Sequence, residues 1–387
     1  MYARIISYPK DSSFFLFGPR STGKSTWVQN EFPSALIIDL LKASVFTRLT
    51  AQPDRLERMI PEGFSDWVII DEIQKVPALL DEAHRLIERR KLKFILTGSS
   101  PRKLRSGGVN LLGGRALTLG MYPLTAAELK GDFELKRALA HGLIPLAYTA
   151  EDPRDFLESY IQVYLQEEIA QEGLIRNIGS FTRFLESASF SQGSILNVST
   201  VARDCAVPRK TVEGYFDILN DLRIGYRVPL FQKRARRKTQ AHPKFYFFDA
   251  GLFRALRPLG PLENDGGTIG PALETLVLQE LIALSSYLRK RYQIHYWRSA
   301  NNMEVDFILY GEKAFFALEV TKASRIREDD TAGLKAFLNE YPQATALLLY
   351  GGTDRYYEDK IHFIPAAEFF KDARNLFFDN HDTLITT

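Results

Sequence analysis

The segment from Phe14 to Thr26 most constrains the fold, because it contains the phosphate-loop pattern G-x-x-x-x-G-K-[ST] without a mismatch. An apolar run leads into the loop, and a segment of helical character follows it. Glycines let the backbone turn tightly around an anion, and the N–H groups then point at phosphate oxygens. The next helix would aim its positive end at the same group. We therefore expect nucleotide binding by Gly18, Pro19, Arg20, Ser21, Thr22, Gly23, Lys24, Ser25 and Thr26.

Two side chains of the loop and two later acids predict hydrolysis as well as binding. Lys24 would neutralise the β and γ phosphates of ATP, which also makes it a catalytic candidate, and Ser25 would ligate Mg²⁺. A second apolar run begins at Trp67 and ends in Asp71 and Glu72. Asp71 would hold the Mg²⁺ through water, and Glu72 would orient or deprotonate the attacking water. Because a loop that only binds nucleotide needs the first acid but not the second, the pair favours ATP hydrolysis.

Hydroxyl and arginine candidates follow two further strands. The apolar run that begins at Lys93 ends in Thr97 and Ser99. Either hydroxyl is suited to bind the γ-phosphate or the attacking water, and the sequence does not decide between them. Thr97 is our catalytic candidate. Arg115 follows a pair of glycines and precedes another strand, which suits contact with a γ-phosphate in cis or across a subunit boundary. The second arrangement would require a homo-oligomer, and the alternative for Arg115 is a solvated surface arginine.

The balance of residue types excludes several classes of protein. A content of 45% hydrophobic and 25% charged residues is typical of a soluble globular protein, and a net charge of +3 says little about partners. The single cysteine, Cys205, excludes an internal disulfide framework and a cysteine-based zinc site. There is no apolar run long enough to cross a membrane and no signal-peptide pattern. We therefore expect a cytoplasmic protein without membrane contact.

The order of patterns predicts four segments. Apolar strands alternate with helical segments in residues 1–130, which predicts an α/β P-loop ATPase domain with a parallel sheet covered by helices on both faces. Residues 131–188 turn helical and form a linker or lid. Residues 189–248 have the pattern of a winged helix-turn-helix. Residues 249–387 form a further α/β domain, which is nuclease-like by the resemblance given below.

Basic residues gather in the segment with the winged-helix pattern. Its second helix begins with Arg209 and Lys210, and the tip of the following hairpin holds Lys233, Arg234, Arg236, Arg237 and Lys238. Clustered cations of this kind predict contacts with the phosphates of DNA, without predicting any base sequence. The alternative is a solvated loop on a winged helix that packs against protein or serves as a lid on the ATPase domain.

The final segment carries acidic residues on neighbouring strands. Asp306 lies on the second strand of a hairpin, Glu319 lies on the next strand, and Thr321 and Lys322 follow it. An acid on each of two adjacent strands, with a lysine nearby, can hold Mg²⁺ and activate water for phosphodiester cleavage. Strand alternation puts Glu319 and Thr321 on one face and Lys322 on the other. The lysine is therefore displaced from the face that carries Glu319.

These motifs and their order resemble the prokaryotic AAA-type ATPases that carry an appended domain of unknown function, the AAA_14/DUF4143 family. The early marks are GPRSTGKST, VIIDEIQKVPALL, FILTGSS and LLGGRALTLGMYPLTAAEL. The later marks are YFDILNDLRIGYRV, KFYFFDAGL, YWRSANNMEVDFIL and ALEVTKAS. The resemblance implies a P-loop ATPase core, a winged helix and a nuclease-like C-terminal domain, and it supplies no known reaction for that domain.

The C-terminal domain also resembles the restriction-endonuclease-like PD-(D/E)xK fold. By that resemblance, Asp306 and Glu319 match the metal-binding acids, and Glu274 matches the acid on the helix. The family pattern normally ends in Glu-x-Lys, whereas this chain has Thr321 at the lysine position. Lys322 would replace that lysine only if a bulge shifted the strand by one residue. The alternative is a catalytically inactive domain that binds DNA or associates with itself.

Two functional interpretations from different classes remain. In the first, an Mg²⁺-dependent ATPase acts on DNA through the winged helix and the nuclease-like domain. In the second, a slow nucleotide-gated switch associates with a partner protein, which requires the nucleotide to bind its two states with different affinities. A sequence-specific transcription regulator is a third interpretation and rests on the helix-turn-helix alone. Stimulation of hydrolysis by DNA distinguishes the first interpretation from the second.

Overall fold

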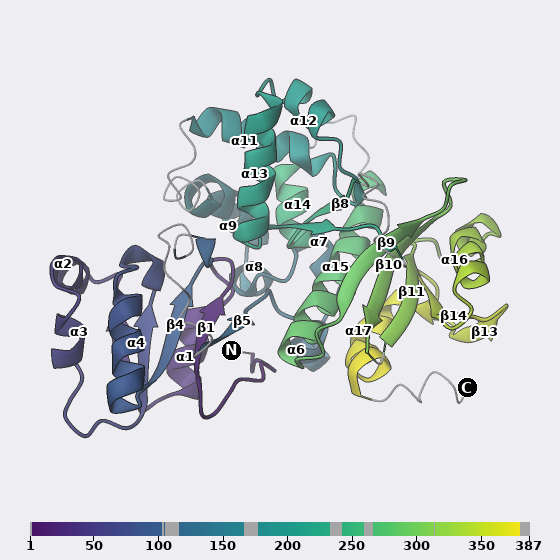
Figure 1. Cartoon of the computed structure of the whole chain (residues 1–387). Helices are drawn as coiled ribbons and strands as arrows, with labels where there is room; N and C mark the ends of the chain where they lie inside the picture. The colour runs from purple at the N-terminus through teal and green to yellow at the C-terminus, as the bar shows by residue number, and fades with distance from the viewer. Residues whose placement is uncertain are drawn as a thin grey trace. The chain divides into compact units, whose positions relative to one another are not determined.

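The computed structural model describes residues 2–102, 104, 116–165, 177–232, 242–258, 266–312 and 314–379. The chain divides into two compact units (Figure 1). The N-terminal unit contains Arg4–Tyr122 together with Asp221–Arg223, and the C-terminal unit contains most of the chain after Tyr122. The three predicted segments after residue 130 therefore share one unit, and the boundaries between them remain predictions.

A five-stranded parallel sheet forms the centre of the N-terminal unit, in the order β2-β3-β4-β1-β5. Its strands are β1 (Ser13–Phe17), β2 (Leu36–Asp39), β3 (Trp67–Asp71), β4 (Lys93–Gly98) and β5 (Ala116–Gly120). Because β4 lies between β1 and β3, the carboxyl ends of these three strands meet at one edge of the sheet. The prediction of a parallel α/β fold for this part of the chain is confirmed.

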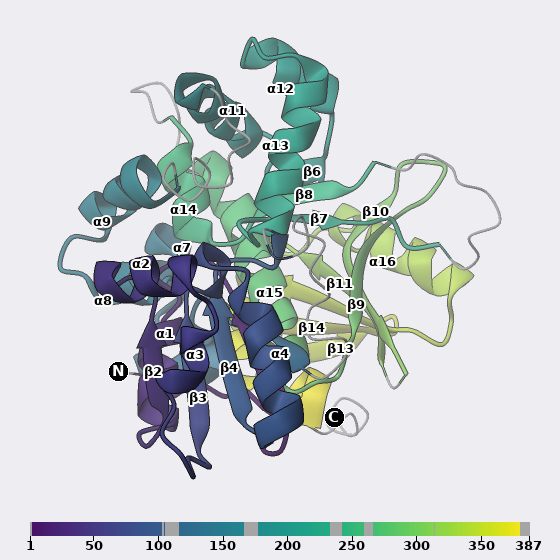
Figure 2. The same cartoon turned by 60° about the vertical axis from the view of Figure 1, so that its left-hand side comes forward.

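Helices cover both faces of this sheet (Figure 2). Strand residues alternate between the faces, so Phe15 and Phe17 share one apolar cluster while Phe14 packs against Phe32 on the opposite side. That cluster contains the buried leucines of α4 (Leu79–Arg90), and α1 (Lys24–Glu31) buries Trp27 beside Phe32. The smaller helices are α2 (Ala43–Ala51), α3 (Arg55–Arg58) and the 3₁₀ turn η1 (Ile73–Lys75).

Several helices lie in the first half of the C-terminal unit. They are α6 (Ala126–Leu129), η3 (Lys130–Asp132), α7 (Leu135–His141), α8 (Pro145–Thr149), α9 (Pro153–Ser159), the π-helical turn η4 (Tyr160–Leu165), α11 (Ile178–Ser189) and, after the small sheet, α14 (Ala250–Leu256). Asp249 connects the turn between α7 and α8 to α14. Its buried carboxylate accepts hydrogen bonds from the backbone N–H groups of Leu143 at 2.7 Å and Leu252 at 3.0 Å. Of these elements, α7, α8, α9 and η4 lie within residues 131–188, and the role of that segment as a linker or lid remains a prediction.

Two helices and a small antiparallel sheet form the middle of the C-terminal unit. The helices are α12 (Val198–Asp204) and α13 (Arg209–Asp221), and the sheet has the order β6 (Ser194–Ile195), β8 (Lys244–Phe247), β7 (Gly225–Val228). Phe216 of α13 packs edge-on against Phe245 of β8, with ring centroids 4.9 Å apart. The assignment of this segment as a winged helix remains a prediction.

A six-stranded mixed sheet forms the remainder of the C-terminal unit, in the order β13-β14-β12-β11-β10-β9 (Figure 1). Its strands are β9 (Gln293–Arg298), β10 (Glu304–Gly311), β11 (Ala314–Val320), β12 (Thr345–Tyr350), β13 (Tyr356–Glu358) and β14 (Ile361–Pro365). Phe337 of α16 (Asp329–Glu340) packs on one side with Ala317, whereas Phe316, the next residue of β11, packs against Phe377 of η5 (Asn375–Asp379). The other helices are α15 (Gly266–Tyr287) and α17 (Ala366–Arg374).

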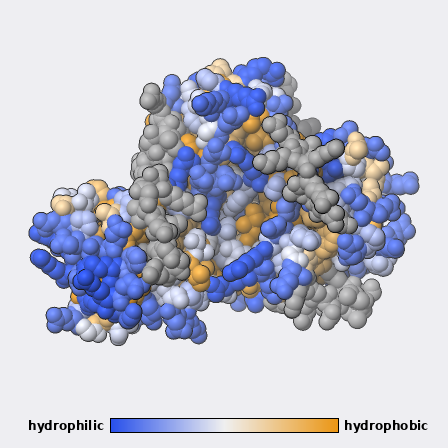
Figure 3. All heavy atoms as spheres, viewed as in Figure 1, coloured by the Kyte–Doolittle hydropathy of each residue, from blue (hydrophilic) through white to orange (hydrophobic). Residues whose placement is uncertain are grey.

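Within the described residues, no helix combines the length and the apolar content that crossing a bilayer requires. On the face seen in Figure 3, hydrophilic residues cover most of the N-terminal unit. The fully buried side chains of Phe15, Phe17 and Leu96 belong to the apolar cluster that includes the leucines of α4.

Candidate nucleotide-binding site and the acidic cluster

The phosphate loop connects the end of β1 to the start of α1. Gly23 has φ of 90°, a left-handed conformation that suits glycine, and Ser21 also has a positive φ of 63°. The backbone N–H of Gly18 donates to the carbonyl oxygen of Gly98 at 3.3 Å, which ties the start of the loop to β4. α1 then begins at Lys24, so its unpaired N–H groups face the loop. The local geometry is that of an anion-binding turn.

Gly18 is required by a close approach of the backbone. A methyl group at this position would lie 2.1 Å from the carbonyl oxygen of Met121, the residue that follows β5. Met121 is held in place because its N–H donates to the carbonyl of Phe17 at 2.8 Å. Any larger residue at position 18 would therefore push the loop away from β5.

The ammonium group of Lys24 lies inside the loop. It donates hydrogen bonds to the carbonyl oxygens of Gly18 at 2.7 Å and Pro19 at 3.0 Å, and the side chain is buried. Thr22 supports the same turn, since its hydroxyl donates to Pro19 at 2.8 Å. A phosphate cradled by the loop would meet a positive charge that is already positioned, which is the role expected of Lys24.

Ser25, Asp71 and Thr97 form a hydrogen-bonded network across three elements. The hydroxyl of Ser25, on α1, donates to Oδ2 of Asp71 at 2.8 Å, and the hydroxyl of Thr97, on β4, donates to Oδ1 of the same carboxylate. The Thr97 hydroxyl also accepts a hydrogen bond from the backbone N–H of Glu72 at 3.2 Å. Thr97 is fully buried, so it positions both acids from β4, the strand next to β3.

Glu72 is held by a residue that the sequence analysis missed. Its backbone has φ of 63°, which is unusual for a residue other than glycine and is typical of functional sites. The side-chain amide of Gln74, which is buried, donates to Oε2 of Glu72 and lies 3.4 Å from the hydroxyl of Ser99. Of the two hydroxyl candidates, Thr97 therefore contacts Asp71 and Ser99 contacts Gln74. In the sequence, Gln74 is an ordinary polar residue two positions after Glu72, and no pattern there indicates this contact.

The arginine and hairpin candidates cannot be compared with the structure. Arg115, and the hairpin residues Lys233, Arg234, Arg236, Arg237 and Lys238, lie outside the described residues. At the start of α13, Arg209 and Lys210 are both exposed, and Arg209 forms an ion pair with Glu213 at 3.0 Å. This exposure leaves both side chains accessible to a ligand.

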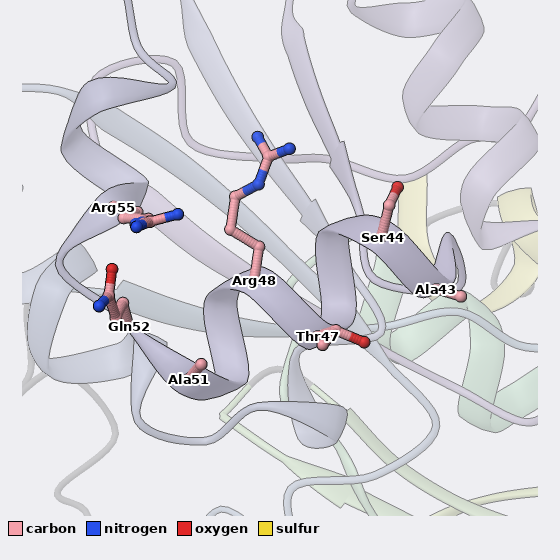
Figure 4. Close-up of a pocket in the computed structure, with 7 residues that line it drawn as sticks. All are labelled: Ala43, Ser44, Thr47, Arg48, Ala51, Gln52 and Arg55. Carbon is pink, nitrogen blue, oxygen red and sulfur yellow. The ribbon is translucent and has the colours of Figure 1, made fainter.

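A surface pocket of the N-terminal unit lies on α2 and the start of α3 (Figure 4). None of its lining residues belongs to the phosphate loop or to the acid pair. Figure 4 shows Arg48 extending from α2, beside Arg55 and Gln52. The pocket therefore shares no residue with the phosphate loop or the acid pair.

The structure brings the acids of the C-terminal domain together around a lysine that the sequence analysis did not include. Lys244, on β8, places its ammonium 2.6 Å from Oε1 of Glu304 and 2.9 Å from Oδ1 of Asp306. The other oxygen of Asp306 accepts a hydrogen bond from Val320, and the Asp306 N–H donates to Oε2 of Glu319 at 3.3 Å. We call Lys244, Glu274, Glu304, Asp306 and Glu319 the acidic cluster.

Burial and mutual charge perturb the pKa values in this cluster. Burial alone would lower the pKa of Lys244, but the carboxylates of Asp306, Glu304 and Glu274 outweigh it and raise that pKa. Burial raises the pKa of Glu274 to about 8, and the charge of Asp306 acts in the same direction. Burial likewise raises the pKa of Glu319 well above its ordinary value. The cluster therefore keeps its lysine charged and disfavours ionisation of Glu274 and Glu319 at neutral pH.

The geometry does not support the metal site expected from Glu274, Asp306 and Glu319. Among the described residues, no three acidic, histidine or cysteine side chains are arranged to hold a metal ion. The hydroxyl of Thr321 accepts a hydrogen bond from the N–H of Ala323 at 3.2 Å, so it serves its own loop. Thr321, at the position expected for the lysine, is thus part of a local turn. The cation of the cluster is Lys244, which lies on β8.

Comparison with known proteins divides the chain into three regions. Residues 10–130 match the family model of an AAA domain, residues 132–263 match a domain of unknown function (DUF8612), and residues 269–369 match a second domain of unknown function (DUF4143). The predicted AAA_14/DUF4143 architecture is therefore confirmed. The AAA domain indicates nucleotide binding and ATPase activity for the N-terminal region.

Relatives that align with most of the chain name no reaction. The chain is 26% identical over 367 residues to an uncharacterized protein of Mycobacterium bovis, covering 91% of this chain and 80% of the relative. An uncharacterized protein of Haemophilus influenzae is 22% identical over 327 residues, covering 78% and 76%. The crystal structure of NtrX from Brucella abortus matches 72% of this chain and 59% of its own at 12% identity, with a TM-score of 0.24. That similarity is too low to support an argument.

Proposed function

Because this chain has the AAA_14/DUF4143 architecture, we propose that it binds ATP at the phosphate loop and hydrolyses it with Mg²⁺. The observation that carries the proposal is the network of Ser25, Asp71 and Thr97, which joins α1, β3 and β4 at one edge of the sheet. A binding turn and an acid pair that were distant in sequence are thereby brought into contact, as hydrolysis requires.

The residues of this network fit an Mg²⁺ ion. The hydroxyl of Ser25 and a carboxylate oxygen of Asp71 lie 2.8 Å apart, and both are the oxygen ligands that Mg²⁺ prefers. When bound, Mg²⁺ would neutralise charge that develops on the phosphates. Lys24 binds the phosphates, Glu72 orients the attacking water and takes up its proton, and Thr97 holds both acids in position. Gln74 fixes the direction of the Glu72 carboxylate.

Nucleotide binding is tested with one lysine of the loop and one outside it. Lys24→Ala should abolish binding of a fluorescent ATP analogue, because it removes the positive charge that the loop presents to the phosphates. Lys42→Ala, a change to an exposed lysine of the same unit, should bind like the wild type. Equal binding by the two variants would refute the assignment of the site.

For the C-terminal unit, we propose a winged helix in residues 189–248 that contacts DNA, followed by a nuclease-like fold that does not cleave it. Exposed Arg209 and Lys210 at the start of α13 support the first part, since cations at a helix start are suited to phosphate contacts. The position of Lys244 among the acids supports the second part. The alternative is a nucleotide-gated switch that recruits a protein partner.

Steady-state ATP hydrolysis with duplex and single-stranded DNA, at two salt concentrations, separates these functions. Salt-sensitive stimulation by DNA, weakened in an Arg209→Ala, Lys210→Ala double variant, would support the DNA-directed ATPase. Hydrolysis that is indifferent to both forms of DNA would refute it. ATP-dependent capture of a partner by the Glu72→Gln variant would then favour the switch. A rise of specific activity with protein concentration would indicate that Arg115 acts across a subunit boundary.

A further inference from the structure

The acidic cluster joins elements from separate parts of the C-terminal unit. Lys244 comes from β8 of the small antiparallel sheet, Glu274 from α15, and Asp306 from β10 of the six-stranded sheet. The lysine and Asp306 are 62 positions apart in the chain. The cluster is therefore a long-range, charged connection between two sheets, and it lies beside the ring contact of Tyr246 on β8 with Phe307 on β10, whose centroids are 5.7 Å apart.

Because Lys244 is buried, its charge depends on the surrounding carboxylates. The Lys244 side chain is 2% exposed and that of Asp306 is 11% exposed, so little water is available to solvate either charge. Tyr246, two residues further along β8, is fully buried and donates its hydroxyl to Glu274 at 3.0 Å. A buried cation of this kind persists only where carboxylates surround it, because an unpaired buried charge is strongly destabilising.

The same burial argues against a catalytic lysine. A lysine that acts on a phosphodiester must reach the scissile phosphate, whereas the Lys244 ammonium is enclosed and already bonded to two carboxylates. The acids that a divalent cation would need are occupied in the same way, since Asp306 accepts from both Lys244 and Val320. The residues present therefore fit an internal ammonium better than a metal.

We propose that the ammonium group of Lys244 takes the place that a divalent cation would have in the acidic cluster. The C-terminal domain then folds without a metal ion, because Lys244 supplies the positive charge. The ammonium group pairs with Asp306 and Glu304, and the guanidinium group of Arg298 lies 3.9 Å from Glu304 as a second cation. Burial disfavours ionisation of Glu274 and Glu319. The cluster then acts as a fixed connection between β8 and the six-stranded sheet. A divalent cation has a place there only after the lysine charge has been removed.

Thermal unfolding without nucleotide tests this proposal, in EDTA and then with Mn²⁺ or Ca²⁺. The wild-type Tm should be the same in all three conditions. Lys244→Met should lower the Tm in EDTA by roughly 10 °C, because Asp306 and Glu304 lose their buried partner. Mn²⁺ or Ca²⁺ should then raise the Tm of this variant by several degrees, and adding Asp306→Asn should abolish that rise.

Lys335→Met is the matched control. It breaks an ion pair of similar length, 2.8 Å between Lys335 and Asp359, but at an exposed position, and it should leave the Tm nearly unchanged in every condition. A wild-type Tm that rises with Mn²⁺ would overturn the proposal. Mn²⁺-dependent DNA cleavage by the wild type, abolished by EDTA, would overturn it as well, and both measurements use the wild type alone. Destabilisation of Lys244→Met without any recovery in Mn²⁺ or Ca²⁺ would overturn it too.

Discussion

Replacing Thr97 by valine removes one hydroxyl from the centre of the nucleotide site and keeps the shape of the side chain. Thr97 is fully buried, donates to the Asp71 carboxylate and accepts from the Glu72 N–H at 3.2 Å. A hydrogen bond to a charged group contributes about 1.5–3 kcal/mol, and a buried N–H left without a partner costs about 1–3 kcal/mol. Since the two effects overlap, we expect Thr97→Val to destabilise the N-terminal unit by about 2–4 kcal/mol.

Thr97→Ser is the control, because it keeps the hydroxyl and removes only a methyl group. Loss of one buried methyl should cost about 1 kcal/mol. Urea unfolding of both variants gives the stabilities, and steady-state ATP hydrolysis gives the rates. Loss of a residue that orients a metal-binding acid typically lowers activity about 10–100-fold, which we expect for valine and not for serine. If valine and serine variants unfolded within about 0.5 kcal/mol of each other and hydrolysed ATP equally fast, the positioning role of Thr97 would be wrong.

Three further predictions concern single residues. Gln74→Leu should lower kcat about tenfold and leave the Kd for ATP unchanged, because Glu72 loses its amide partner; an unaltered kcat would exclude this role. Gly18→Ala should weaken ATP binding at least about tenfold by displacing the loop, while Gly214→Ala, whose added methyl meets no atom within 4 Å, should bind normally in the same titration. Burial raises the pKa of Glu280 from 4.5 to about 8, so its contribution to stability is present below pH 4.5 and is lost as pH rises toward 8. Urea unfolding of Glu280→Gln from pH 5 to pH 8 should therefore show a smaller loss of stability than the wild type, and identical slopes would contradict this.

The sequence contained enough information to predict the N-terminal sheet. β1 and β3 are short, wholly buried strands, and such strands are recognised from continuous apolar runs. The pairing of Ser25 with Asp71 also follows from motifs, because a phosphate loop and an acid-ended strand share one edge of a parallel sheet. The choice between Thr97 and Ser99 did not follow, since it depends on which hydroxyl faces Asp71.

The contacts that were missed depend on long-range packing rather than on local pattern. Lys244 stands in an aromatic strand, KFYF, and nothing nearby in sequence indicates that its charge meets Asp306 on another sheet. Gln74 is an ordinary polar residue in a short turn, and only the folded site shows its contact with Glu72. Most of the basic residues behind the DNA-binding prediction belong to the hairpin and lie outside the described part of the chain. Arg209 and Lys210 are the two that the structure describes, and both are exposed.

The most direct measurement compares ATP hydrolysis and ATP binding in the wild type and in Glu72→Gln. Our account predicts Mg²⁺-dependent turnover by the wild type. It predicts that the variant retains its Kd for ATP but loses at least about 99% of kcat, because the carboxylate that accepts the proton of the attacking water is gone. Wild-type turnover that persists undiminished in Glu72→Gln would contradict the central claim that this site hydrolyses ATP through the Asp71–Glu72 pair.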